Sequence, residues 1–375
     1  MYKVYLDGVR IYDDFTPLEE YKLSEPKMVL EDNAAGSFEF MLPKINRGYG
    51  KVNLLTSTIE VRRDADDAFW RFRPITRDKD WWNNEKIFCE GELAFLNDSI
   101  QPQAEYHDRT PKQFVGDLLT AHNKYTDARK RFYPGIVTVT KGDEEGSTTL
   151  YRLTDYESTF ECFQDKLIER LGGHLRIRYE NGLRYLDYLS TYNAKVVQEI
   201  NFGKNLLDYS SNFTLADICT VLIPLGKSLD EENYTSDHIE ALSEYLTVKS
   251  VNGGSIYVTN DTPLKTFGRF ERVEKWDDVE LPENLLKRAR EYLKSLQYDN
   301  VVLEINAFDW NLLDPGVKPL NLLDQIRAKS VPHGMDHVFP ITKMEIPLDN
   351  PSGTTLTLGY ETNPTLTKQF AKNSK

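Results

Sequence analysis

The sequence predicts a mixed fold that is mainly β and contains α+β parts. Three observations support this prediction: apolar and polar side chains alternate in the first hundred residues, a helical period begins at Thr110, and a group of residues near Lys51 is echoed near Lys318. Alternation is typical of a half-buried strand, whereas apolar residues three and four apart are typical of a helix. A chain of 375 residues is long enough for two to four domains.

Residues 1–105 predict an all-β domain. Two runs alternate clearly, Phe38-Glu39-Phe40-Met41-Leu42 and Ile59-Glu60-Val61-Arg62. Gly and Pro lie between the runs, and these residues favour turns. We therefore expect strands joined by short connections throughout this segment.

Residues 106–200 predict an α+β domain. Thr110 followed by Pro111 is typical of a helix start, because Thr caps the first turn and Pro tolerates the first helical position. Ser158 and Glu161 have capping-box spacing in a second predicted helix over residues 155–171. After this helix, Asn181-Gly182 separates two apolar runs and predicts a β-hairpin.

Residues 229–316 predict a second α+β domain. Helices are expected over residues 237–246 and 283–296, the latter entered by Pro282. Strands are expected over residues 255–259 and 301–308.

A β unit is predicted to occur twice in the chain. The matching residues are Lys51, Asn53, Leu54, Leu55, Ile59, Val61 and Arg62 in one copy and Lys318, Asn321, Leu322, Leu323, Ile326, Ala328 and Lys329 in the other. We therefore expect Leu54 to align with Leu322 and Ile75 with Ile341. A chance likeness between alternating strands is the alternative.

The front of the second copy is expected far upstream of its main part. Cys219, Val221, Ile223 and Pro224 match the spacing of Phe38, Phe40, Leu42 and Pro43 in the first copy. The second β domain is thus predicted over residues 201–228 and 317–362, with 229–316 inserted and 363–375 as a C-terminal tail. Two similar domains in one chain provide two similar lateral surfaces. A ring whose pseudo-symmetry is twice the number of its chains requires such surfaces.

Charge and composition limit the classes of function. The net charge is −13, which argues against tight binding of nucleic acid over a broad surface. No apolar run is long enough to cross a bilayer or to form a signal core. Cys89, Cys162 and Cys219 lie far apart and lack the spacing of zinc or redox motifs, so they predict isolated thiols.

No motif predicts a catalytic, cofactor-binding or metal-binding residue. Leu225-Gly226-Lys227-Ser228 ends like a phosphate-binding loop, but Val221 stands where that loop needs its first glycine. His333 and His337 have zinc-helix spacing, yet Pro332 and Gly334 oppose a helix there. Acidic clusters near residues 64–67, 143–145, 230–232 and 277–280 are interpreted as solvated loops rather than as glycosidase carboxylates.

Trp81 and Trp82 lie beside a predicted turn at Asn83. A sugar-stacking platform is one interpretation of such a pair. Aromatic residues next to a hairpin turn more often cover the end of a barrel or lie in an interface. We therefore favour a core or interface position.

The chain resembles the prophage endopeptidase tail, or tail-associated lysin, family of phage tail hubs. The resemblance rests on Ala35-Gly36-Ser37-Phe38-Glu39-Phe40, Gly203-Lys204-Asn205-Leu206, the run from Thr220 to Gly226 and Leu313-Asp314-Pro315-Gly316. It implies two related tube-like β-barrel domains and two α+β domains. Three copies would form a pseudo-sixfold ring at the virion tail tip, assembled in the cytoplasm of the bacterial host.

The resemblance also implies partners and a role. A homotrimer would join the hexameric distal tail protein and other tail-tip proteins, with the tape measure protein as a further candidate, and DNA would pass through without specific binding. Relatives often carry a lytic domain after the hub, whereas only residues 360–375 follow Gly359 here. We therefore expect a structural protein without enzymatic activity. A peptidoglycan hydrolase with its activity in residues 229–316, and a receptor-binding or carbohydrate-binding module, are the alternatives.

Overall fold

The structure is a computed structural model that describes residues 2–143, 146–191, 195–212, 219–229, 244–261, 264–265, 268–295, 302–307, 309–330 and 335–359. The chain divides into two compact units. Unit 1 contains the residues up to Ser210 together with Leu303–Gly359, and the described part of unit 2 lies within Ser211–Val302. The fold is mostly β, as the sequence predicts.

The N-terminal part of unit 1 is all β. Its strands are β1 (Tyr2–Leu6), β2 (Val9–Asp13), β3 (Ser24–Glu31), β4 (Ser37–Leu42), β5 (Ile59–Arg63), β6 (Ala68–Lys79) and β7 (Glu85–Gly91), with short helical turns η1 (Glu19–Tyr21) and η2 (Glu92–Asp98). The predicted alternation is confirmed in β4, where Phe38, Phe40 and Leu42 are buried and the two phenylalanine ring centroids lie 4.9 Å apart.

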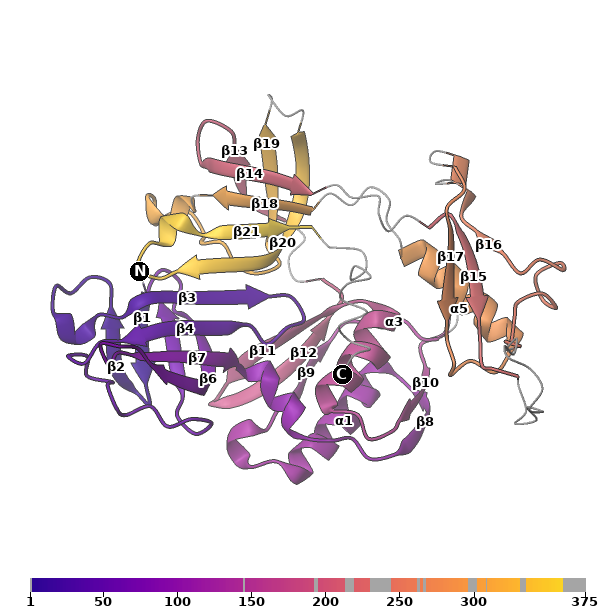
Figure 1. The fold of residues 1–375 in the computed structure, drawn as a ribbon, viewed down its shortest axis with the longest axis horizontal. Helices are drawn as coiled ribbons and strands as arrows, with labels where there is room; N and C mark the ends of the chain where they lie inside the picture. Colours follow the sequence, from indigo (N-terminus) through magenta and orange to yellow (C-terminus); the bar gives the residue numbers. More distant parts are fainter. Residues whose placement is uncertain are drawn as a thin grey trace. The chain divides into compact units, whose positions relative to one another are not determined.

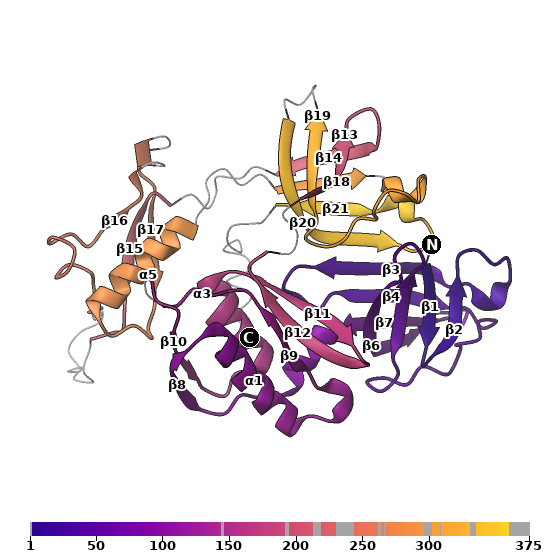
Figure 2. The ribbon, with the colours of Figure 1, turned by 180° about the vertical axis from the view of Figure 1, so that it is seen from behind.

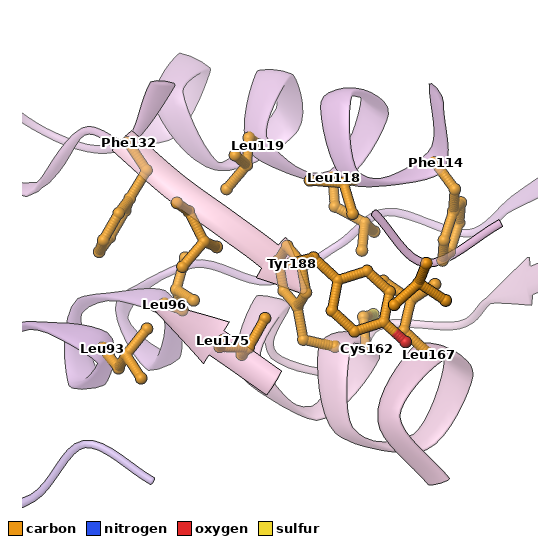
Figure 3. Close-up of a cluster of buried hydrophobic side chains, with 14 of the residues drawn as sticks. Leu93, Leu96, Phe114, Leu118, Leu119, Phe132, Cys162, Leu167, Leu175 and Tyr188 are labelled. Carbon is orange, nitrogen blue, oxygen red and sulfur yellow. The ribbon is translucent and has the colours of Figure 1, made fainter. Parts of the chain in front are cut away.

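An α+β part follows in unit 1. Its elements are β8 (Ala104–Arg109), α1 (Pro111–Tyr125), η3 (Ala128–Lys130), β9 (Tyr133–Val137), β10 (Leu150–Thr154), α2 (Thr159–Phe163), η4 (Gln164–Ile168), α3 (Glu169–Leu171), β11 (His174–Glu180) and β12 (Leu183–Leu189). Figure 2 shows β9, β12 and β11 side by side, in the order in which they pair. In Figure 3, Leu118 and Leu119 of α1 point toward Tyr188 of β12, and all three side chains are buried.

The predicted helix starts of this part are confirmed. Thr110 and Gln113 form a capping box at the start of α1, and Ser158 and Glu161 form one at the start of α2. The second helix thus begins at Thr159, four residues later than predicted, because the cap fixes where the first turn can start. At the predicted hairpin, Asn181 and Gly182 both have positive φ, as a two-residue turn of this kind requires.

The C-terminal part of unit 1 returns to β structure. Its elements are β13 (Val196–Asn201), β14 (Leu206–Asn212), β18 (Val302–Ala307), η5 (Trp310–Leu312), β19 (Gln325–Ser330), β20 (Met335–Pro347), η7 (Pro351–Gly353) and β21 (Thr355–Leu358). These strands join those of the N-terminal part in one 13-stranded sheet. Figure 1 shows β21, β20, β3, β4 and β7 next to one another in that sheet.

Unit 2 is a small α+β unit. It contains β15 (Val221–Leu225), β16 (Val258–Thr259), β17 (Glu271–Lys275) and α5 (Pro282–Ser295). Leu285 and Ala289 of α5 pack with Leu222 of β15 in its core. The predicted helix at 283–296 is confirmed as α5, with its last residue outside the described part. Of the other predicted helix, residues 237–243 lie outside the described part, and residues 244–246 are not helical, because Tyr245 forms an antiparallel bridge with Ser228.

The predicted place of one strand is wrong. Val221–Leu225 was expected in the second β domain, but this strand pairs with β16 and β17 of unit 2. The strand that fills the expected place in unit 1 is β18, which pairs with β21. Alternation identifies a strand but not its partner, so the spacing match to Phe38 and Phe40 was misleading.

Candidate functional site

One strand motif occurs twice in the sheet of unit 1. The N-terminal repeat has the order β3-β4-β7-β6-β5, and the C-terminal repeat has the order β14-β18-β21-β20-β19. Beyond this motif the repeats differ, because β1 pairs with β5 antiparallel whereas β13 pairs with β19 parallel. The two copies are therefore the same motif with different flanking strands.

The register of the two repeats agrees in detail. Ile59 lies opposite Phe72 in the N-terminal repeat, and Ile326 lies opposite Phe339 in the C-terminal repeat. The pairing of β6 with β7 is interrupted after Pro74, and that of β20 with β21 is interrupted after Ile341. Each of these pairs of equivalent residues is 267 positions apart.

A strained turn is also repeated. The N–H of Leu55 donates to the carbonyl of Pro74 at 2.8 Å, and the N–H of Leu323 donates to that of Ile341 at 2.7 Å. Both leucines have positive φ, 62° and 64°, which is uncommon for a residue other than glycine. The expected match of Leu54 with Leu322 is confirmed, whereas Ile341 corresponds to Pro74 rather than to Ile75.

The two repeats are joined by main-chain pairing of β20 with β3. The antiparallel register runs from Lys343 opposite Glu31 to Pro347 opposite Lys27. At its end the N–H of Leu348 donates to the carbonyl of Pro26 at 2.8 Å, and Leu348 is fully buried. This junction, called the internal joint below, makes one continuous sheet from two copies.

Among the described residues, no strand pairs with the equivalent edge of the N-terminal repeat. Strand β6 pairs with β5 only as far as Phe72, and its residues 76–79 are all exposed. The hairpin that follows carries Trp81 and Trp82, which are 89% and 73% exposed. The structure thus places the tryptophan pair at the tip of a hairpin on the surface rather than in a core.

The acidic clusters are engaged in ion pairs where the structure describes them. The pairs are Lys3–Asp64 at 2.9 Å, Arg63–Asp66 at 2.7 Å, Arg152–Asp143 at 2.5 Å, Arg288–Asp278 at 2.8 Å and Lys227–Glu280 at 2.5 Å. Burial opposes ionisation of Asp66, but the hydrogen bond from Arg63 outweighs it and lowers its pKa. The hydrogen bond from Lys227 likewise lowers the pKa of Glu280. A general acid requires a raised pKa, so these carboxylates fit a structural role.

The other sequence candidates also have structural explanations. Lys227 of the loop-like run pairs with Glu280, and a side chain on Gly226 would lie 2.7 Å from the carbonyl of Val279, so no open phosphate cradle exists there. His337 lies on a strand, and His333 is outside the described residues. In the described part of the chain, no cluster of three or more His, Cys, Asp or Glu could hold a metal ion.

A buried Ser–His pair escaped the sequence analysis. The hydroxyl of Ser99 lies 2.6 Å from Nδ1 of His122, and Nε2 of His122 lies 3.0 Å from the carbonyl of Lys130. Because that carbonyl can only accept, Nε2 carries the proton and Nδ1 accepts from Ser99. His122 is fully buried, and Ser99 also contacts Thr159 at 2.7 Å, so a polymeric substrate cannot reach this pair.

A cavity of about 540 Å³ opens in unit 1 among residues of both repeats and β11. Three arginines in its wall are held by carboxylates, in the pairs Arg63–Asp66, Arg71–Glu60 and Arg176–Asp187, each at 2.7 Å. Their charges are compensated within the chain. The cavity therefore presents no uncompensated cationic cluster for an anionic ligand.

Comparison with known proteins assigns the fold to phage tail proteins. The tail protein of Neisseria meningitidis MC58 superposes with a TM-score of 0.62 at 13% identity, covering 96% of this chain and 97% of that one. The prophage tail protein gp18 of Listeria monocytogenes EGD-e superposes with a TM-score of 0.55 at 14% identity, covering 99% and 98%. No curated protein matches the chain in sequence.

A more distant likeness extends beyond phages. The E. coli c3393 protein, described as a component of the type VI secretion system with structural similarity to the T4 bacteriophage tail proteins gp27 and gp5, superposes with a TM-score of 0.50 at 9% identity. The alignment covers 97% of this chain and 77% of that one. At these identities the likenesses show a shared fold.

The sequence family agrees with the fold. The family model described as prophage endopeptidase tail matches residues 194–369. The resemblance to prophage tail proteins that the sequence indicates is thereby confirmed. Among the described residues, no helix is long and apolar enough to cross a membrane.

Proposed function

We propose that this chain is a structural hub protein of a phage or prophage tail tip. In this proposal three copies form a ring that joins the tail tube and the distal tail protein to the tip and lets DNA pass. The observation that carries it is the internal joint, in which one strand motif pairs edge to edge with a second copy of itself.

The ring follows from repeating this junction. A contact between two different surfaces of the same motif can be repeated from one copy to the next. The copies close into a ring if a whole number of the rotations between neighbours adds up to 360°. Two motifs per chain then give six positions from three chains. This number fits the hexameric neighbour that the family resemblance implies.

Each part of the chain has a place in this proposal. The N-terminal and C-terminal repeats, with their flanking strands, would be the two tube-like β-barrel domains around the axis. Residues 106–200 and the inserted unit would be the two α+β domains. The position of every part would be at the virion tail tip.

A structural role is favoured over a lytic one. The described acidic clusters are ion-paired, and Ser99 and His122 are buried. Purified protein is therefore expected to leave cell walls intact in a zymogram, with a known lysin as the positive control. Clearing that disappears after one Asp or Glu substitution would contradict the structural proposal.

The ring itself is tested by mass. Native mass measurement across a concentration series should show a species of three times 43.4 kDa that grows as concentration rises. Images of that species should show six similar lobes around a central opening. A dimer that persists at high concentration would contradict the proposal.

A further inference from the structure

We infer that the free edge of β6 is the docking site for β14 of the next copy of this chain. This inference rests on the proposed ring and names the strands that would join its subunits. The pairing would be antiparallel and would repeat the internal joint between different chains.

Comparison with the internal joint shows that, among the residues that the structure describes, the edge of β6 lacks a partner strand like the one that covers β20. In the C-terminal repeat, β20 is covered by β3 of the N-terminal repeat. In the N-terminal repeat, β6 is the strand equivalent to β20, and its residues 76–79 are exposed. The strand equivalent to β3 is β14, which stands at the end of the strand order and, within the part of the chain that the structure describes, has β18 as its neighbour in the sheet. Each chain therefore carries both halves of one further joint.

Backbone geometry makes the β6 edge competent for pairing. In β20 the carbonyl of Thr342 and the N–H of Leu348 bond to the β3 segment, so even-numbered residues face that strand. Arg77 and Lys79 lie 267 positions before Met344 and Ile346, so their main-chain N–H and carbonyl groups are expected to face outward from the edge of β6 in the same way. The N–H of Asp80 donates to the carbonyl of Asn84 at 3.1 Å, so after the irregularity that follows Pro74 the even-numbered residues face β7 instead.

The side chains at the β6 edge oppose unspecific pairing with other strands before assembly. At the internal joint, Met344 and Ile346 are buried, as suits a contact made once during folding. At the β6 edge the equivalent residues are Arg77 and Lys79, both exposed, and charged side chains on an edge strand oppose indiscriminate pairing.

Trp81 supplies an apolar anchor for the same joint. Counting by the same 267 positions, Trp81 corresponds to Leu348, which is fully buried at the end of the internal joint, whereas Trp81 is 89% exposed. By the same equivalence Trp81 would lie beside the start of β14, where Phe202 and Leu207 are exposed. A tryptophan that becomes buried at an interface is a typical hot spot.

The neighbouring Trp82 provides a matched control. It corresponds to Asp349, which remains exposed at the internal joint. Both tryptophans are already on the surface of the single chain, so replacing either should preserve the fold. Trp81→Ala is expected to raise the dissociation constant of the trimer roughly tenfold or more, and Trp82→Ala to change it much less.

Hydrogen exchange tests the main-chain pairing directly. The amides of Arg77 and Lys79 should exchange quickly in the dilute single chain and about 100-fold more slowly in the trimer. A trimer in which these amides stay unprotected, or which Trp81→Ala and Trp82→Ala affect equally, would overturn the edge pairing and leave the ring standing. A chain that shows no trimer at any concentration would overturn the ring and this joint together.

Discussion

Leu55 and Leu323 occupy equivalent positions with different surroundings. Both adopt the left-handed backbone region, which costs a residue with a side chain roughly 1 kcal/mol or more. Leu55 is 57% exposed, whereas Leu323 is only 3% exposed. The strain is therefore offset by burial in the C-terminal repeat but not in the N-terminal one.

This difference predicts opposite effects of one substitution. Leu55→Gly relieves the backbone strain and removes little buried surface, so it should leave the free energy of unfolding unchanged or raise it by up to about 1 kcal/mol. Leu323→Gly also removes a buried side chain and should lower it by about 2–4 kcal/mol. Urea unfolding of the two variants at equal concentration measures this contrast. Equal losses would contradict the argument that burial of Leu323, and not of Leu55, offsets the strain.

His122 predicts a specific pH dependence of stability. Burial lowers its pKa below the usual 6.5, and the carbonyl of Lys130 and the charge of Asp98 only partly oppose this effect. The unfolded chain therefore binds a proton at higher pH than the folded chain, so the stability contributed by neutral His122 is complete above pH 6.5 and falls as the pH drops below it.

The measurement is the change in melting temperature between pH 7.5 and pH 5.5. It should be larger for the unmodified chain than for His122→Asn, which cannot titrate. The ion-paired carboxylates with lowered pKa, such as Asp66 and Asp98, titrate below this window and do not confuse the comparison. An identical pH response in both proteins would contradict the assignment.

At the scale of elements, helix α1 offers a test of its cap. The side chain of Thr110 accepts from the N–H of Gln113, and its loss should lower the free energy of unfolding by about 1 kcal/mol in Thr110→Ala. Thr120 lies on the exposed face of the same helix and donates to the carbonyl of Gly116. Thr120→Ala is the control and should be neutral or slightly stabilising, since alanine is the better helix former. A thermal melt of both variants decides the matter.

The local elements could be predicted because their signals are local. The capping residues at Thr110 and Ser158 and the Asn181-Gly182 turn act within a few residues, so the sequence alone identifies them. The internal repeat was also detectable, since a run of similar residues recurs at a nearly constant offset around Leu55 and Leu323.

The partners of strands could not be predicted in the same way. Val221–Leu225 has the alternation of a sheet strand, but its place is decided by contacts with β17 and α5. The free edge of β6 was hidden for a similar reason. Trp81 can be seen in the sequence, but its proposed role at an interface depends on its correspondence to the buried Leu348. Only the structure shows this correspondence.

For the whole molecule, the net charge of −13 predicts weak interaction with DNA. Contacts between lysine or arginine and phosphate release counterions and add affinity, so a wall rich in such contacts would retain a passing genome. We expect a neutral to acidic channel wall and no retention of duplex DNA by the trimer at physiological salt. Mobility-shift titration at low and physiological salt measures this. Binding at physiological salt that weakens steeply as salt rises would contradict it.

The place where unit 2 enters the chain has a consequence for engineering. Strands β14 and β18 are neighbours in the sheet, yet residues 213–301 separate them in sequence, where the N-terminal repeat has only the turn between β3 and β4. That shorter turn is anchored, because Asn33 donates to the carbonyl of Gly173 at 3.0 Å and Asp32 contacts His174 at 2.8 Å. Adjacent strands lie only about 4.8 Å apart. The chain therefore leaves the sheet after β14 and returns to it at β18 at nearly the same place, so the inserted unit leaves the sheet undisturbed. The connection between β14 and β18 is thus the site at which a foreign domain could be exchanged for unit 2. A domain inserted into the turn between β3 and β4 would instead break the contacts that Asn33 and Asp32 make with Gly173 and His174.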